Sequence, residues 1–232
     1  MDAAAQAAPG AGAASGRGVG ILGGCFNPVH NGHLRLAIEV REQLGLARVE
    51  LMPAHVPPHK PGEGMLPFAL RAALAEAAVA GVPGLAVSRL EAARPGPSYT
   101  VDTLAALGAA WPGVPLWFIL GAGDLAGLPG WHRGLEIPEL CNLAVAGRGG
   151  AGPEAVAAFV AAHWPVAGPD GAGGWRLPGG NCLRPVALQR LDISASDVRA
   201  RWLAGRCLAA LVPREVERAL GAGADAVRAA WA

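Results

Sequence analysis

Short apolar runs alternate with longer amphipathic segments along most of this chain. Runs bounded by glycine or proline predict buried strands, and they lie at 19–23, 49–52, 85–88, 116–120 and 143–146. Apolar residues at helical spacing predict helices between them, over 33–44, 68–80 and from Ser98 or Thr100, either of which could be the cap, to about 111. Because strands alternate with helices, we expect an α/β fold with a doubly wound parallel sheet.

The second half of the chain has a weaker pattern. Glycine, alanine and proline dominate residues 149–182, where we expect one helix over 153–162 and a loop over 171–180. Helices over 196–204 and 213–220 predict a small helical C-terminal end that begins at about residue 194. We expect a single domain over 18–232.

Residues 1–17 differ from the rest of the chain. They are rich in alanine and glycine and contain no Leu, Ile, Val or Phe. A segment without core-forming side chains is expected to be disordered, and it also lacks the apolar region of a signal peptide.

Composition excludes several classes of protein. A net charge of +1 argues against a protein that wraps nucleic acid. The longest uncharged run, 103–123, contains Pro112 and Pro115, which argues against a membrane span. The four cysteines form no C-x-x-C pair, so neither a zinc knuckle nor a redox motif is predicted. We expect a cytoplasmic protein.

Three glycines near the start match the dinucleotide-binding pattern G-x-G-x-x-G by letter. They are Gly18, Gly20 and Gly23, and they lie inside the first predicted strand rather than between a strand and a helix. The pattern has meaning only in that second context. A dehydrogenase is therefore disfavoured.

The most informative stretch runs from Gly23 to Leu34 and reads GGCFNPVHNGHL. It leaves the first strand and enters the first helix, with His30 and His33 three residues apart and expected on one side. A helix N-terminus favours phosphate, so the two imidazoles could bind a triphosphate. The alternatives are two loop histidines without a ligand, or half of a metal site whose other ligands are not evident.

These residues resemble a known family. His30-Asn-Gly-His33 resembles the H-x-G-H signature of the nucleotidyltransferase superfamily, and the longer stretch is similar to GG(T/S)F(D/N)PxHxGH of bacterial nicotinate-nucleotide adenylyltransferases. The resemblance continues in order to about Leu220, through Pro57-Pro-His-Lys60, Arg71, Pro97-Ser-Tyr-Thr100, Trp131 ten residues after Gly121, Arg148, and Ile193-Ser-Ala-Ser-Asp-Val-Arg199. It implies a Rossmann-like nucleotidyltransferase fold.

The resemblance also implies roles for individual residues. Those implied in catalysis are His30, His33 and Arg199. Those implied in ATP binding are Gly23, Gly24, Cys25, Phe26, Asn27, Gly121, Asp124, Ser194 and Ser196. Those implied in mononucleotide binding are His59, Lys60, Arg71, Tyr99, Thr100, Trp131 and Arg148, among which Lys60 is the chain's only lysine and Tyr99 its only tyrosine.

Three positions depart from the family's pattern. Cys25 replaces the usual Thr or Ser, and Ser196 replaces a Thr while keeping the hydroxyl. Gly123 stands where the family usually has the Asp of G-A-D, and Asp124 comes one residue later. Either Asp124 substitutes through a shifted turn, or a carboxylate contact to the nucleotide is lost.

The implied reaction is adenylyl transfer from ATP to nicotinate mononucleotide, with Mg²⁺ held mainly through the ATP phosphates. The expected partners are these two small molecules, without nucleic acid or membrane. The alternatives are another phosphate acceptor, such as nicotinamide mononucleotide or phosphopantetheine, and a nucleotide-binding regulator with weakened catalysis.

Overall fold

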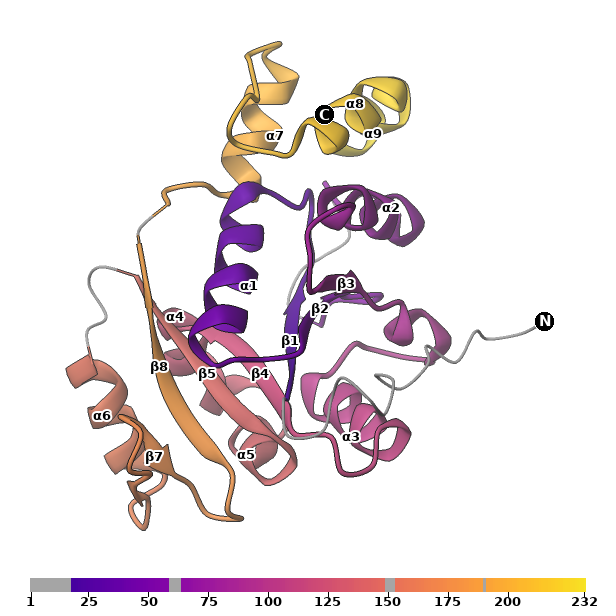
Figure 1. Ribbon diagram of the computed structural model, residues 1–232. Coiled ribbons are helices and arrows are strands. Elements are labelled where there is room, and N and C mark those ends of the chain that lie inside the picture. The colour runs from indigo at the N-terminus through magenta and orange to yellow at the C-terminus, as the bar shows by residue number, and fades with distance from the viewer. Residues whose placement is uncertain (1–17, 59–63, 149–152, 190) are drawn as a thin grey trace.

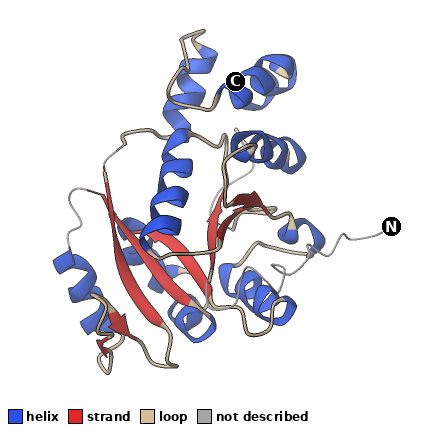
Figure 2. Ribbon diagram, in the orientation of Figure 1, coloured by secondary structure: helices blue, strands red, loops and turns tan. Residues whose placement is uncertain are grey.

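The computed structural model describes residues 18–58, 64–148, 153–189 and 191–232. The expectations for residues 1–17, and for His59 and Lys60, lie outside these ranges. Within them, a twisted sheet is flanked by helices on both faces (Figures 1 and 2).

The sheet is mostly parallel, as predicted. Its strand order is β3-β2-β1-β4-β5-β8-β7-β6, in which β7 pairs antiparallel with both β6 and β8 and the other neighbouring strands pair parallel. The parallel strands are β1 (Val19–Gly24), β2 (Arg48–Pro53), β3 (Leu85–Val87), β4 (Leu116–Gly121), β5 (Asn142–Arg148) and β8 (Cys182–Leu188). The antiparallel edge is β6 (Gly168–Pro169) and β7 (Trp175–Arg176). The order runs outward from β1 in both directions, which confirms the doubly wound fold.

Helices bury one core on each face of the sheet. One face carries α1 (Asn31–Gln43), α2 (Phe68–Val79), α7 (Ala195–Leu203), α8 (Arg214–Ala222) and α9 (Ala224–Trp231). The other carries α3 (Thr100–Ala110), α4 (Ala122–Gly127), α5 (Ile137–Leu140) and α6 (Pro153–His163). The strands serve both cores by alternation: Phe118 and Leu120 of β4 enter the second core, and Ile119 enters the first.

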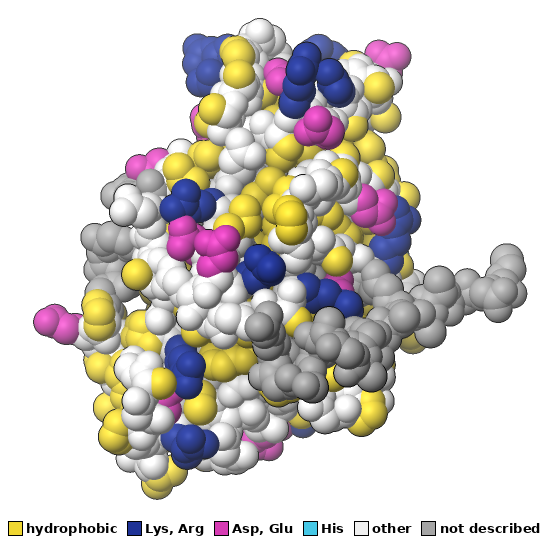
Figure 3. All heavy atoms as spheres, in the orientation of Figure 1, with side chains coloured by type: hydrophobic (Ala, Val, Ile, Leu, Met, Phe, Trp, Pro, Cys, Tyr) yellow, Lys and Arg dark blue, Asp and Glu magenta, His cyan; other side chains and the backbone are white. Residues whose placement is uncertain are grey.

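The C-terminal helices extend the first face beyond the sheet. In Figure 1, α7 stands above α1, and α8 and α9 lie beside α2. Apolar side chains border the junction between these helices and the rest of the molecule (Figure 3). The helical C-terminal end is therefore confirmed, with α9 as an element that the sequence pattern did not predict.

Two other expectations were incomplete or wrong. Neither Ser98 nor Thr100 caps α3: Tyr99 is the N-cap and no side chain makes the capping hydrogen bond. Residues 168–188 contain three strands that were not predicted, and β7 lies inside the predicted 171–180 loop. The missed strand β8 includes Pro185, whose ring interrupts the apolar pattern.

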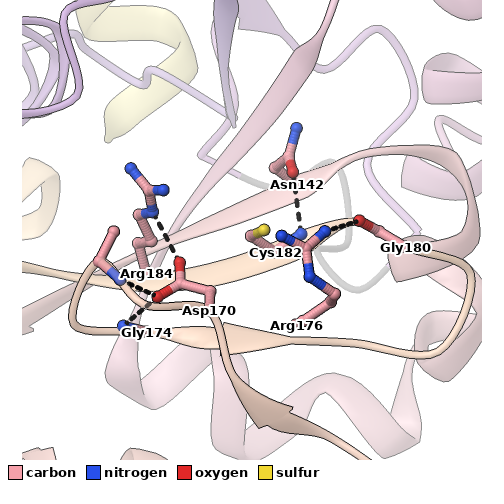
Figure 4. A network of polar contacts seen from close by, with 8 residues as sticks. Asn142, Asp170, Gly174, Arg176, Gly180, Cys182 and Arg184 are labelled. Atoms are coloured by element: carbon pink, nitrogen blue, oxygen red, sulfur yellow. Dashed lines mark hydrogen bonds and ion pairs between the residues drawn. The ribbon is translucent and has the colours of Figure 1, made fainter.

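The antiparallel edge is held by a polar network around Asp170 (Figure 4). The Asp170 carboxylate accepts hydrogen bonds from Ala172 N at 2.8 Å, Gly174 N at 2.9 Å and Arg184 Nε at 2.9 Å. Asn142 Oδ1 accepts from Cys182 N at 2.9 Å, which ties β8 to β5. These contacts stabilise the glycine-rich edge of the sheet.

Candidate active site

Two adjoining cavities open at the carboxyl ends of β1 and β4. This is the point where the strand order reverses, and such points bind ligands in open α/β sheets. The larger cavity has a volume of about 750 Å³ and the smaller about 510 Å³. The residues that line both are Gly23, Gly24, Cys25, Ile119, Leu120 and Asp124.

The loop from β1 to α1 forms one wall of the larger cavity. Phe26 is buried there in a left-handed conformation with φ +45°, which costs about 1–2 kcal/mol for a residue with a side chain. Its ring packs edge-on against His33, with centroids 4.9 Å apart. The loop is therefore strained locally and held by packing.

His30 and His33 lie together at the start of α1, as the spacing predicted. Their rings are stacked with centroids 3.6 Å apart and an interplanar angle of 25°. His30 N donates to His33 Nδ1 at 3.2 Å, which places the proton of a neutral His33 ring on Nε2. His33 lines the larger cavity, whereas His30 is only 4 % exposed and borders neither cavity.

Gly32 makes this arrangement possible. A Cβ at position 32 would lie 3.0 Å from Nδ1 and 3.1 Å from Cε1 of His30, which is tighter than side chains normally tolerate. The glycine of the H-x-G-H segment therefore gives room to the first histidine ring.

The start of α7 completes the larger cavity from the other end of the chain. Arg199 lines it and donates from Nη1 to the carbonyl of Asn27 at 2.8 Å. Ser194 caps α7 by accepting from Asp197 N at 3.1 Å, and its hydroxyl lies 3.0 Å from that of Ser196. Residues 172 positions apart in sequence thus meet at one site.

Asp124 stands between the two cavities. Its Oδ2 accepts a hydrogen bond from Gly121 N at 3.1 Å, so the carboxylate is turned back to the end of β4. Gly123 lines the larger cavity, and a Cβ there would meet nothing within 4 Å. The position of the family's usual Asp thus has space for a side chain.

Aromatic rings border the smaller cavity, with Thr100 beside them. Tyr99 stacks on His132 with centroids 4.2 Å apart, and Trp131 meets Phe118 edge-on at 6.2 Å. The structure thus brings Tyr99, Thr100 and Trp131 together as the sequence predicted. His132 also lines this cavity and was not predicted. The only signal for it in the sequence is its place directly after Trp131.

Glu91 is a second lining residue that the sequence pattern did not reveal. This buried carboxylate accepts from His55 N at 3.2 Å and from Thr103 Oγ1 at 2.9 Å. Ser98 Oγ accepts from the next amides, His55 N at 3.0 Å and Val56 N at 3.1 Å. Both side chains hold the segment that leads to Pro57. Glu91 lies in a 3₁₀ helix (Leu90–Ala93), which is too short to show a periodic pattern of apolar residues.

One arginine of the predicted set lies elsewhere. Arg71 is 1 % exposed within α2 and donates from Nε to Leu66 O at 2.9 Å and from Nη1 to Cys25 O at 2.7 Å. Burial lowers the pKa of this guanidinium, against the opposing influence of Cys25 and Glu91. It lines neither cavity. Arg148 is the last residue of β5.

Metal ligands do not gather in the described part of the chain. Across those ranges, His, Cys, Asp and Glu side chains nowhere form a group of three that could hold a metal ion. Asp124 is the one carboxylate residue among those lining the larger cavity. None of the helices in the described ranges has the length and apolarity to cross a bilayer.

Comparisons with known proteins agree with this geometry. The cytidylyltransferase-like family model matches residues 21–201. The chain is 40 % identical over 205 residues to a protein of Geotalea uraniireducens named "Probable nicotinate-nucleotide adenylyltransferase", which covers 86 % of this chain and 93 % of that one. A protein of the same name from Halorhodospira halophila is 42 % identical over 214 residues, covering 89 % and 94 %.

A solved structure shares the fold at low sequence identity. It is the Plasmodium falciparum nicotinic acid mononucleotide adenylyltransferase complexed with NaAD, with a TM-score of 0.69 and 13 % identity. The match covers 89 % of this chain and 95 % of that one. The fold expected from the sequence is therefore confirmed.

Proposed function

Because this chain belongs to the nicotinate-nucleotide adenylyltransferase family of cytidylyltransferase-like proteins, we propose that it transfers the adenylyl group of ATP to nicotinate mononucleotide. The products are deamido-NAD and pyrophosphate. The observation that carries the proposal is the pair of cavities with a shared wall at Gly24, Cys25 and Asp124. Two substrates bound there would bring their phosphates together at the carboxyl end of β1.

The larger cavity suits the triphosphate of ATP. His33 and Arg199 border it as hydrogen-bond donors, and the positive end of the α1 helix dipole adds positive potential. Arg199 uses Nη1 on Asn27 O, which fixes the guanidinium while its other N–H groups remain suited to phosphate oxygens. We assign Ser194 and Ser196 to the same substrate from the start of α7, and His30 to the support of His33.

The smaller cavity suits the pyridine nucleotide. Trp131 and Tyr99 offer aromatic faces for stacking on the pyridine ring, and Thr100 offers a hydroxyl at its edge. Lys60, with His59, would approach the mononucleotide phosphate from the Pro57–Pro58 side. For Arg71 we propose a different role from the mononucleotide contact expected from sequence: its buried guanidinium holds the carbonyl of Cys25 in the shared wall.

The chemistry needs no protein nucleophile. The phosphate oxygen of the mononucleotide is already anionic and attacks the α-phosphorus of ATP, and the bond to pyrophosphate breaks. The protein then contributes alignment and stabilisation of the negative charge that moves to the leaving pyrophosphate. We assign the stabilisation of that charge to His33, Arg199 and the positive end of α1.

We propose Mg²⁺ as the divalent cation that this family uses. Mg²⁺ keeps several waters and is commonly held through substrate phosphates, so it asks for few protein ligands. A single carboxylate, Asp124, in the larger cavity fits that demand. When bound, the ion neutralises charge on the phosphates.

The test is pyrophosphate release from ATP with each candidate acceptor in turn. We expect turnover with nicotinate mononucleotide and much less with nicotinamide mononucleotide or phosphopantetheine. Turnover with one of the latter alone would reassign the acceptor. Tight ATP binding without turnover of any acceptor would favour the regulator.

A further inference from the structure

Asn27 connects four separate parts of the chain at the wall of the larger cavity. Its side chain is 6 % exposed and donates from Nδ2 to Gly64 O at 2.6 Å. Its Oδ1 accepts from Leu66 N at 3.1 Å and from Trp231 Nε1 at 3.3 Å. Its backbone carbonyl accepts from Arg199. A small change in Asn27 would therefore move several residues of the ATP site together.

Trp231 reaches this site from the last helix of the chain. Its indole is buried, and it meets Trp202 of α7 edge-on with centroids 5.5 Å apart. Trp202 lies one helical turn after Arg199. The indole therefore contacts both the phosphate loop, through Asn27, and the helix that carries Arg199.

The hydrogen bond from Trp231 Nε1 to Asn27 Oδ1 helps to fix the orientation of the Asn27 amide. The two oxygen lone pairs of the Asn27 amide point at Leu66 N and Trp231 Nε1, and its N–H points at Gly64 O, so rotation of the amide would break three bonds. A tryptophan N–H is a donor only, and a buried one is normally paired. Without the indole N–H, the Asn27 side chain would keep only its hydrogen bonds to Gly64 O and Leu66 N.

We propose that Trp231 is a positioning residue for adenylyl transfer, which fixes Asn27 and thereby the phosphate loop and Arg199 without touching substrate. This inference rests on the proposed function. It gives α9, which lies far from the H-x-G-H segment in sequence, a part in the reaction.

The experiment compares wild type with Trp231→Phe, which keeps an aromatic ring and removes the donor. We expect kcat/KM for ATP to fall about three- to tenfold, the size of one hydrogen bond, while KM for nicotinate mononucleotide stays unchanged. Replacement of Trp231 by benzothienylalanine, which has a sulfur in place of the N–H and nearly the same shape, should give the same result. It also provides a test if the phenylalanine variant fails to fold.

Trp164→Phe is the matched control. Trp164 is also buried and also meets a ring edge-on at 5.5 Å, that of Phe159, but it packs in the core on the opposite face of the sheet. We expect it to leave kcat/KM for ATP unchanged. In an Asn27→Ala background the effect of Trp231→Phe should disappear, because the two residues act through one bond.

An unchanged kcat/KM for ATP in both Trp231 variants would overturn the inference. An equal loss of kcat/KM in Trp164→Phe would do the same. So would a Trp231→Phe effect that stays at full size in the Asn27→Ala background. Wild-type turnover of nicotinate mononucleotide is read in the same assay. Its absence would instead refute the proposed function.

Discussion

The imidazole rings of His30 and His33 stack with their centroids 3.6 Å apart, and the amide of His30 donates to Nδ1 of His33. The two histidines lie in different surroundings. His33 borders the larger cavity, and His30 supports it from a buried position. Gly32 between them leaves the space that the His30 ring needs.

We predict that His33→Ala lowers kcat by about 10²–10³, because it removes a donor aimed at the triphosphate. His30→Ala should also lower kcat by orders of magnitude, since His33 loses its stacking partner. Pyrophosphate release measures the rate, and circular dichroism checks the fold. A folded His33→Ala protein with wild-type turnover would remove the histidines from the mechanism.

Gly32→Ala should impair catalysis without unfolding the protein. The new Cβ would approach the His30 ring to 3.0 Å and displace it, yet alanine is favoured over glycine in a helix by about 1 kcal/mol. We expect kcat to fall at least about tenfold and the melting temperature to change little. Gly108→Ala in α3 is the control, because a Cβ there meets nothing within 4 Å. Equal kinetics for both variants would contradict this account.

The sequence predicted most of the central sheet because β1, β3, β4 and β5 contain continuous apolar runs beside glycine or proline. β2 was predicted although Glu50 lies inside it. The prediction failed at β8, where Pro185 and the charged Arg184 interrupt the run, and at β7, whose pairing depends on the Asp170 network. The pattern of apolar residues indicates which positions of a single strand or helix are buried. It does not indicate a strand that is held in place by polar contacts from another segment.

The smaller cavity yields a prediction that separates the two substrates. Trp131→Ala removes an aromatic face, and we expect KM for nicotinate mononucleotide to rise about tenfold or more, the value of about 1–2 kcal/mol of stacking. KM for ATP should not change, since Trp131 does not line the larger cavity. A rise in both constants would show that the two cavities do not bind separate substrates. Initial-rate measurements with each substrate varied in turn decide the matter.

Substitutions at Asp124 and Gly123 can show whether Asp124 replaces the Asp that the family usually has one residue earlier. If Asp124 has taken over the family's usual Asp, Asp124→Ala should lower kcat/KM for ATP about tenfold or more, as expected for loss of a charged contact. Adding Gly123→Asp to that variant should restore part of the activity, because position 123 has room for a side chain in the same cavity. Wild-type kinetics for Asp124→Ala would mean that the contact is lost in this protein.

Motifs pointed to many of the residues that line the two cavities, but not to how these residues contact one another. Nothing local in the sequence indicates that Arg199 donates to the carbonyl of Asn27 or that Arg71 holds that of Cys25. Both contacts join segments brought together only by packing of α2 and α7 on the sheet. The same limit applies to Arg71, because its place in the motif order does not indicate its contact with Cys25.

The last prediction concerns stability and pH at the sheet edge. Burial would raise the pKa of Asp170, but hydrogen bonds from Ala172 N and Gly174 N, together with Arg184, outweigh it and lower that pKa below its ordinary value of 3.8. A lowered folded-state pKa contributes stability above the ordinary value, and this contribution is lost as pH falls through the folded-state value. Asp170→Asn should therefore reduce the free energy of unfolding by about 1–2 kcal/mol near neutral pH.

The difference between wild type and Asp170→Asn should begin to shrink as pH drops below 3.8, where the carboxylate of the unfolded chain becomes protonated. It should disappear below the lower folded-state pKa, where the carboxylate of the folded protein is protonated as well. Urea unfolding at several values between about pH 7 and about pH 3 measures both free energies. Glu42→Gln, at an exposed position of α1, is the control. It should change the free energy of unfolding by no more than about 0.5 kcal/mol at any pH. A constant difference across the whole range would mean that the Asp170 charge contributes nothing, and that its hydrogen-bonded shape alone stabilises the β6–β7 edge.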